Sequence, residues 1–251
     1  MVAGLALAVG SGWALGQSQA AIEPGARQIV VLANHARAAQ GVRPLKWDAA
    51  LAEAARLHCQ RMAEEGPISH RYGGEPDLGE RAGAAGAHFS LIEENVAIGP
   101  TPAAIHDEWM HSEGHYRNLM NPEVDRVGVA LVASRGVLYA VADYAAGVPV
   151  LTVEQAEAKT KALVRVSGVA VRNDPTAARA ACAMDRGMPV AESGPQPMFV
   201  MRWQDANLGQ LPQRLVDQLG SRKYREAAVG SCEAQNVEGA FTVYRMAVLL
   251  Y

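Results

Sequence analysis

The stretch from Glu93 to Val132 constrains the fold of this chain most, because it carries helix, turn and strand signals in quick succession. Thr101 is a favourable N-cap residue, and Pro102 suits the first position of a helix, where its missing N–H costs nothing. We therefore predict a helix over residues 102–111. Turns carry functional residues more often than their length suggests, so this stretch is also the first place to look for a site.

The second half of the same stretch predicts a turn followed by a strand. Gly114 is unfavourable inside a helix and is a common stop, so His115 is expected on a turn. Residues 127–132 form an apolar run typical of a buried strand, and residues 137–144 form another. Gly136, between them, is free to take a positive φ, which predicts a hairpin.

Two further helices are predicted before this stretch. Apolar residues recur at helical spacing over residues 26–40, and Asp48 is placed to cap a helix over residues 49–65. His58 falls on the apolar face of the second helix, where a histidine is more often a hydrogen-bonded core residue than a metal ligand. Residues 66–92 contain many glycines and prolines and are predicted to be largely loop.

Composition describes a globular protein with a sizeable core. Hydrophobic residues make up 49% of the chain and charged residues 20%, and the net charge is −3. There is no basic run, so composition argues against a nucleic-acid-binding protein.

The first twenty residues carry no charge and resemble the apolar core and small-residue cleavage site of a signal peptide. The basic segment that usually precedes such a core is missing, and a disordered tail or an uncleaved anchor are the alternatives. Glycines interrupt the run, and it is shorter than the roughly 20 residues that span a bilayer, so no stable transmembrane span is expected. We therefore expect a secreted protein, extracellular or periplasmic.

The three cysteines do not form a disulfide-rich pattern. Cys182 and Cys232 either pair, which would contribute about 4 kcal/mol in the chain-entropy model, or are two separate buried thiols. Cys59 lies on a predicted helix and is expected to be a small core residue and not a nucleophile.

Composition shifts after residue 144, which predicts a second domain. Gly147 and Pro149 mark the boundary, and Thr152 begins a polar helical segment. Residues 162–171, 197–203 and 241–250 have strand character, whereas 176–183 and 211–219 look helical. We predict a smaller α+β or β-rich domain over residues 150–251, of unknown type.

Residues 28–144 resemble the CAP domain (cysteine-rich secretory, antigen 5 and pathogenesis-related proteins) in its bacterial SCP-like form. The resemblance is carried by an ordered series of short motifs. In chain order they are Asn34-His35-Ala36-Arg37 with Gly41, Pro44-Leu45-Lys46-Trp47, Leu51-Ala52 through Met62, Ser69-His70, Arg81, Glu94-Asn95-Val96-Ala97, Trp109-Met110 with Ser112, Gly114-His115-Tyr116-Arg117-Asn118, Leu119, Asn121-Pro122 and Val127-Gly128-Val129.

The resemblance implies an α-β-α sandwich over residues 26–146 and a cleft of two histidines and two acids. Of these, it assigns His70, Glu94 and His115. The second acid has no clear match, because Ser112 stands where eukaryotic relatives carry Glu, and Glu108 and Glu113 are only neighbours. The eukaryotic disulfides are absent. Arg81 and Arg117 are expected to tie loops to carboxylates such as Glu94 or Asp125, and the alternative is that they bind an anionic ligand.

The leading functional hypothesis is a secreted, non-catalytic binding module for a lipid, a peptide or a cell-envelope component. The alternative is a metal-dependent hydrolase or peptidase, in which His70 and His115 bind zinc or another divalent cation and Glu94 is a ligand or general base. The spacing of these residues carries no metal-ligand signature. A third hypothesis is an interaction protein that acts through residues 150–251.

Overall fold

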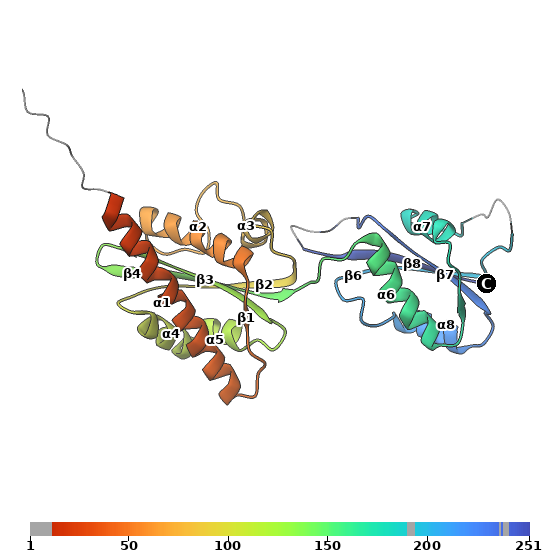
Figure 1. The fold of residues 1–251 in the computed structure, drawn as a ribbon, viewed down its shortest axis with the longest axis horizontal. Helices are drawn as coiled ribbons and strands as arrows, with labels where there is room; N and C mark the ends of the chain where they lie inside the picture. The colour runs from red at the N-terminus through yellow and green to blue at the C-terminus, as the bar shows by residue number, and fades with distance from the viewer. Residues whose placement is uncertain (1–11, 190–193, 236, 238–240) are drawn as a thin grey trace, which may run out of the picture. The chain divides into compact units, whose positions relative to one another are not determined.

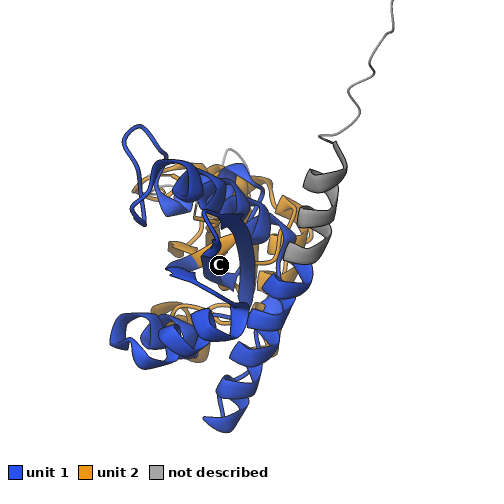
Figure 2. Ribbon diagram, turned by 90° about the vertical axis from the view of Figure 1, so that its left-hand side faces the viewer, with its two compact units in different colours: residues 1–87, 91–147 blue, residues 88–90, 148–251 orange. Residues whose placement is uncertain are grey.

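The chain divides into two compact units, coloured separately in Figure 2. The computed structural model describes residues 12–189, 194–235, 237 and 241–251. Unit 1 consists of residues 1–87 and 91–147, and unit 2 of residues 88–90 and 148–251. Each unit has its own four-stranded sheet and its own apolar core.

Unit 1 is built around a sheet with strand order β1-β3-β4-β2, in which β1 runs parallel to β3 and β4 antiparallel to it. The first two residues of β2 are counted with unit 2. The elements in chain order are α1 Gly12–Ala39, β1 Lys46–Trp47, α2 Ala49–Glu65, α3 Leu78–Ala84, β2 Phe89–Gly99, α4 Pro102–His111, α5 Glu113–Met120, β3 Arg126–Ser134 and β4 Val137–Gly147.

Helices cover both faces of this sheet, as the strand alternation requires (Figure 1). In β3, Val129 and Leu131 face the core shared with α1, α4 and α5, whereas Ala130 faces α2. The two cores are thus formed by side chains on opposite faces of one sheet, each covered by helices, which confirms the predicted α-β-α sandwich.

Close contact between α2 and β3 depends on Gly128. A Cβ atom at this position would lie 2.0 Å from the backbone nitrogen of Ala52, so any side chain would force the helix off the sheet. The hairpin between β3 and β4 turns at Arg135 and Gly136, both with positive φ, as two-residue hairpins of this hand require.

The predicted helix caps are confirmed. Asp48 accepts hydrogen bonds from the first turn of α2, and Thr101 accepts one from Ala104 at the start of α4. Three features differ from the prediction. Helix α1 begins at Gly12 and continues through Pro24. The predicted loop 66–92 contains α3 and the start of β2, and His115 is on a helix.

The prediction of a turn at His115 was wrong because Gly114 does not end α4. That helix ends at His111, and α5 begins at Glu113 after the single extended residue Ser112. Gly114 is therefore in the first turn of α5, where the N–H groups have no helical partner in any case and glycine is less costly than in a helix interior.

Unit 2 repeats the layered arrangement with a sheet of order β5-β7-β8-β6. Helices α6 and α8 pack on one face and α7 on the other. The strand predicted over residues 162–171 is mostly the end of α6, and only two residues of it are strand. The elements are α6 Val153–Val166, β5 Ala170–Val171, α7 Thr176–Ala183, β6 Phe199–Asp205, α8 Gln213–Gly220, β7 Glu226–Cys232 and β8 Tyr244–Leu250.

Cys182 and Cys232 form a disulfide that joins α7 to β7, which selects the paired alternative. Cys59 is free and fully buried under the unit 1 sheet. No helix among the described residues combines the length and apolar character that crossing a bilayer requires. Residues 1–11 of the signal-peptide-like segment lie outside the described part of the chain.

Candidate functional site

The structure brings His70 and Glu94 into direct contact at the β2 edge of the unit 1 sheet. His70 lies in the loop after α2, and its Nδ1 is 2.8 Å from Oε1 of Glu94. The other oxygen of Glu94 accepts a hydrogen bond from Nη2 of Arg81 at 2.6 Å. Glu94 and Arg81 are buried, whereas the His70 side chain is 62% exposed. The expected bond between Arg81 and Glu94 is confirmed.

A second histidine–glutamate pair is buried next to the first, with Nε2 of His58 3.9 Å from Oε2 of Glu94. Nδ1 of His58 is 2.7 Å from Oε1 of Glu75, and Nε2 is 2.9 Å from the carbonyl oxygen of Ser69. A carbonyl can only accept, so Nε2 carries a proton and donates it. His58 is fully buried, which confirms its predicted role as a hydrogen-bonded core residue. It links α2 to the loop that presents His70.

His115 reaches the same edge from the opposite face of the sheet. Its backbone carbonyl accepts a hydrogen bond from Asn95 Nδ2 at 3.0 Å, and Asn118 donates to the carbonyl of Glu94 at 3.1 Å. Glu94 and Asn95 are consecutive in β2 and so point to opposite faces. The strand therefore holds His70 by one face and α5 by the other.

The carboxyl end of α5 is fixed by Arg37, a fully buried residue of α1. Its guanidinium donates to the carbonyl oxygens of Leu119, Asn121 and Val124 at 2.7–3.1 Å. Arg37 belongs to the Asn-His-Ala-Arg motif, and these bonds give that motif a structural role. The position of α5, and with it that of His115, is therefore set by a buried cation on a distant helix.

His70 and His115 have opposite electrostatic surroundings. The hydrogen bond to Glu94 raises the pKa of His70. Burial lowers the pKa of His115, and the nearby charge of Glu108 opposes this only in part. Nδ1 of His115 is buried and has no hydrogen-bond partner among the described residues. These surroundings favour the charged form of His70 and the neutral form of His115.

A second acid does lie beside Glu94, but from an unexpected strand. Asp143 of β4 is completely buried, and its side chain interacts with that of Glu94 through a hydrogen bond. Burial raises the pKa of Asp143 well above its usual range, and the charge of Glu94 adds to the effect. Of the neighbours considered from sequence, Glu108 is near enough to influence His115, whereas Glu113 pairs with Arg117 in solvent.

The geometry does not assemble a metal centre from the predicted ligands. Among the described residues, no three His, Cys, Asp or Glu side chains lie where they could hold one ion. Glu94 is already bound by Arg81 and orients His70 through Nδ1. The predicted zinc ligands His70 and His115 therefore gain no third protein ligand from the described part of the fold.

Sequence reasoning missed Glu75 and Asp143. Glu75 lies in a glycine- and proline-rich loop, which gave no reason to expect a buried carboxylate. One signal was available nearby: Asp77 and Glu80 have the spacing of a capping box, and they form one at the start of α3. That helix carries Arg81 into the site.

Comparison with known proteins identifies the class of unit 1. The model of the cysteine-rich secretory protein family, CAP, matches residues 31–144. Uncharacterized protein YkwD of Bacillus subtilis (strain 168) is 34% identical over 112 residues, which are 43% of this chain and 42% of that protein. Uncharacterized membrane protein YlbC of the same strain is 34% identical over 110 residues, 42% of this chain and 31% of that protein. The match thus spans less than half of either relative.

Solved structures with a similar arrangement include two bacterial surface or extracellular proteins. One is an extracellular protein containing an SCP domain from Bacillus anthracis str. Ames, with a TM-score of 0.49 and 25% identity, covering 52% of this chain and 43% of that one. Another is an outer surface protein from Borrelia burgdorferi, with a TM-score of 0.45 and 19% identity, covering 48% of this chain and 91% of that one.

Residues 31–144 therefore form a CAP domain, the domain of a family of extracellular proteins. The two relatives that are 34% identical over this region are both bacterial, in agreement with the bacterial form that the motifs from Asn34 to Val129 had predicted. Unit 2 lies outside the matched residues.

Proposed function

We propose that this chain is an exported binding protein whose CAP domain holds a cell-envelope ligand, a lipid or a peptide, in the cleft of His70, Glu94 and His115. The proposal rests on the contact between His70 and Glu94, in which an exposed side chain is held by a buried one. The imidazole of His70 is largely exposed, yet a buried ion pair between Glu94 and Arg81 holds it in place. A fixed, exposed donor at a cleft is suited to recognising a ligand.

The same contact argues for binding without turnover. Both oxygens of Glu94 are engaged, one by His70 and one by Arg81, and the side chain is only 3% exposed. A general base must reach the proton that it removes, and Glu94 has no free oxygen to do so. The groups that a ligand can meet are the two imidazoles.

The test uses the full chain with two defined probes: vesicles of phosphatidylethanolamine and phosphatidylglycerol, and a soluble muramyl peptide. Binding is measured for the wild type, for the His70→Ala/His115→Ala double variant, and for His111→Ala as a control on the exposed side of α4. We expect one probe to bind, the double variant to lose at least about tenfold in affinity, and the control to be unchanged.

Product analysis and metal analysis of the same samples discriminate the hydrolase alternative. Cleavage of either probe that is lost in the double variant would overturn the binding proposal. So would near-stoichiometric zinc that disappears with the two histidines. Failure of both probes to bind would also contradict the proposal as stated.

A further inference from the structure

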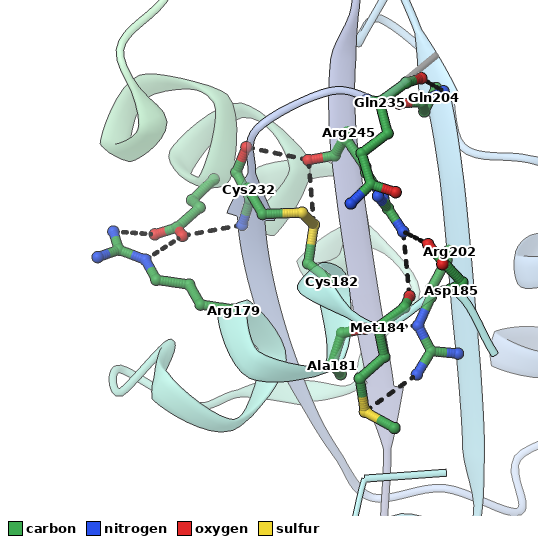
Figure 3. The surroundings of a disulfide bond; sticks show 12 residues. Arg179, Ala181, Cys182, Met184, Asp185, Arg202, Gln204, Cys232, Gln235 and Arg245 are labelled. Atoms are coloured by element: carbon green, nitrogen blue, oxygen red, sulfur yellow. Dashed lines mark hydrogen bonds and ion pairs between the residues drawn. A yellow bond between two sulfur atoms is a disulfide. The ribbon is translucent and has the colours of Figure 1, made fainter. Parts of the chain in front are cut away.

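Unit 2 contains a polar cavity that shares no residue with the site of His70, Glu94 and His115. Its volume is about 270 Å³, and it lies at one end of the β6–β8 pair. Two arginines, Arg202 and Arg245, reach it from neighbouring strands (Figure 3). The lining residues are Asp185, Arg202, Trp203, Gln204, Gln235 and Arg245.

The register of the two strands places both arginines on one face. Arg245 is directly opposite Gln204, and Arg202 is opposite Ala247, so the four side chains share a side of the sheet. This is the face on which α7 packs through Ala247. Two guanidinium groups are thus held at the edge of an apolar layer, where cations are rarely placed without a partner.

Arg245 is 7% exposed and is incompletely bonded. Its Nη2 donates to the carbonyl of Met184 at 3.0 Å and to Oδ1 of Asp185 at 3.2 Å. Its Nη1 is buried and has no hydrogen-bond partner among the described residues. Buried donors are normally satisfied, so the guanidinium of Arg245 keeps hydrogen-bonding capacity that the described residues do not use.

The charge in the cavity is also incompletely balanced. Arg202 donates to the carbonyls of Ala181 and Gly187, which are neutral acceptors. Burial lowers the pKa of Arg202, and the charge of Arg245 lowers it further. Asp185 is the one carboxylate among the described lining residues, and its side chain is 80% exposed. Among the lining residues that the structure describes, two cations therefore face one exposed anion.

The walls of the cavity are fixed in place before any ligand arrives. The Cys182–Cys232 disulfide anchors α7 just before Met184, and Cys232 lies opposite Arg245 in the β7–β8 ladder. On the other side, Gln204 exchanges two hydrogen bonds with the backbone of Gln235, at 2.7 and 2.9 Å. Preorganised donors bind a ligand without an ordering cost.

We propose that this cavity binds an oxyanion, the carboxylate or phosphate group of a small molecule, between Arg202 and Arg245. Guanidinium groups bind both kinds of oxyanion through paired, charge-assisted hydrogen bonds. Asp185 already accepts one charge-assisted hydrogen bond from Arg245 and so competes with the ligand. The inference is independent of the function proposed for the CAP cleft.

The experiment titrates the full, disulfide-bonded chain with sodium acetate and, separately, with sodium phosphate, at an ionic strength held constant with sodium chloride. Binding is read from the side-chain N–H resonances of Arg202 and Arg245. We expect a saturable shift of both resonances with at least one anion, and the arm that saturates identifies carboxylate or phosphate.

Three variants make the test specific. Arg202→Gln should weaken binding by about tenfold or more, because it removes a charge-assisted donor. Arg165→Gln, on the exposed side of α6, makes the same charge change and should alter affinity by less than about twofold. Asp185→Asn should strengthen binding by about fivefold, because it removes the competing carboxylate.

Asp185→Asn keeps the hydrogen bonds from Arg202 and Arg245 to backbone carbonyls. It therefore tests anion binding even if Arg202→Gln fails to fold. The proposal is overturned if neither anion gives a saturable shift. It is equally overturned if Arg165→Gln weakens binding as much as Arg202→Gln, or if Asp185→Asn does not strengthen it.

Discussion

Unit 1 contains two histidine–glutamate pairs of almost the same length, and they differ in what surrounds them. His58 and Glu75 are 2.7 Å apart and His70 and Glu94 2.8 Å apart. The His58 side chain is wholly buried, whereas that of His70 is 62% exposed. The same pair of residue types therefore stabilises the interior of unit 1 at His58 and presents an imidazole to solvent at His70.

The difference originates in the elements that carry the two rings. His58 is on the apolar face of α2, so the helix delivers both of its nitrogens to acceptors inside the protein. His70 is in a loop, and only its Nδ1 has a partner among the described residues. Identical residue types thus acquire different roles through the burial of the second nitrogen.

Arg81 connects the two pairs, and its loss should have the largest effect. Its guanidinium lies 2.6 Å from Glu94 and 3.8 Å from Glu75, both buried. Arg81→Leu removes the one guanidinium that the two buried carboxylates share and leaves them only their histidine and backbone partners, which should lower the free energy of unfolding by about 3–5 kcal/mol. Denaturant unfolding of the full chain, followed by circular dichroism, measures the change.

A matched control for this prediction is Arg117→Leu. Arg117 also forms an arginine–glutamate pair, with Glu113 at 3.2 Å, but both side chains are exposed. We expect a change within about 0.5 kcal/mol. Equal losses in the two variants would mean that burial does not distinguish the pairs.

The next largest effect should separate the two histidines directly. His58→Ala removes a buried ring and takes away the hydrogen bonds that it makes to Oε1 of Glu75 and to the carbonyl of Ser69, at a cost of roughly 3 kcal/mol. His70→Ala removes an exposed ring and should cost less than about 1 kcal/mol. The same unfolding experiment compares them. A larger loss for His70 would reverse the assignment of roles.

The smallest effect is a dependence on pH that belongs to His70. The hydrogen bond to Glu94 raises the pKa of His70 above its ordinary value of 6.5 in the folded protein. The folded state thus binds the proton more tightly, so His70 stabilises it fully below about pH 6.5, and this contribution is lost as pH rises through the raised pKa. The stability difference between wild type and His70→Gln should shrink accordingly, as denaturant unfolding at a series of pH values measures.

The control for this prediction compares two titrations by nuclear magnetic resonance. In the Glu94→Gln variant the pKa of His70 should fall, because the charged acceptor is gone. An unchanged titration of His70 would show that Glu94 does not hold its proton.

Much of the unit 1 fold was predictable because its local signals agree with its packing. Asp48 and Thr101 begin helices at the positions where the hydrogen bonds show them. The strand β2 was missed because Glu93 and Glu94 interrupt its apolar pattern. These two carboxylates are accommodated in the strand because Arg81 donates a hydrogen bond to Glu94 and Asn121 donates one to Glu93. Such tertiary partners cannot be read from a local sequence pattern.

The candidate site was predictable only in part. His70 and Glu94 were identified by their resemblance to a known motif, and the structure places them in contact. Glu75 and Asp143 could not be found, since each is buried through contacts with residues far away in sequence. In unit 2 the strand β7 was missed as well, for its run of small residues, Ala227 to Ser231, resembles a helix or loop as much as a strand.

The burial of Cys59 has a consequence for the order of events during oxidation. The thiolate is the reactive form in disulfide exchange, and burial raises the pKa of this thiol to about 12. Domains fold in turn from the N-terminal end as a chain emerges. Once unit 1 has folded and buried Cys59, only the thiols of Cys182 and Cys232 are available to react. These two cysteines can then form a single disulfide.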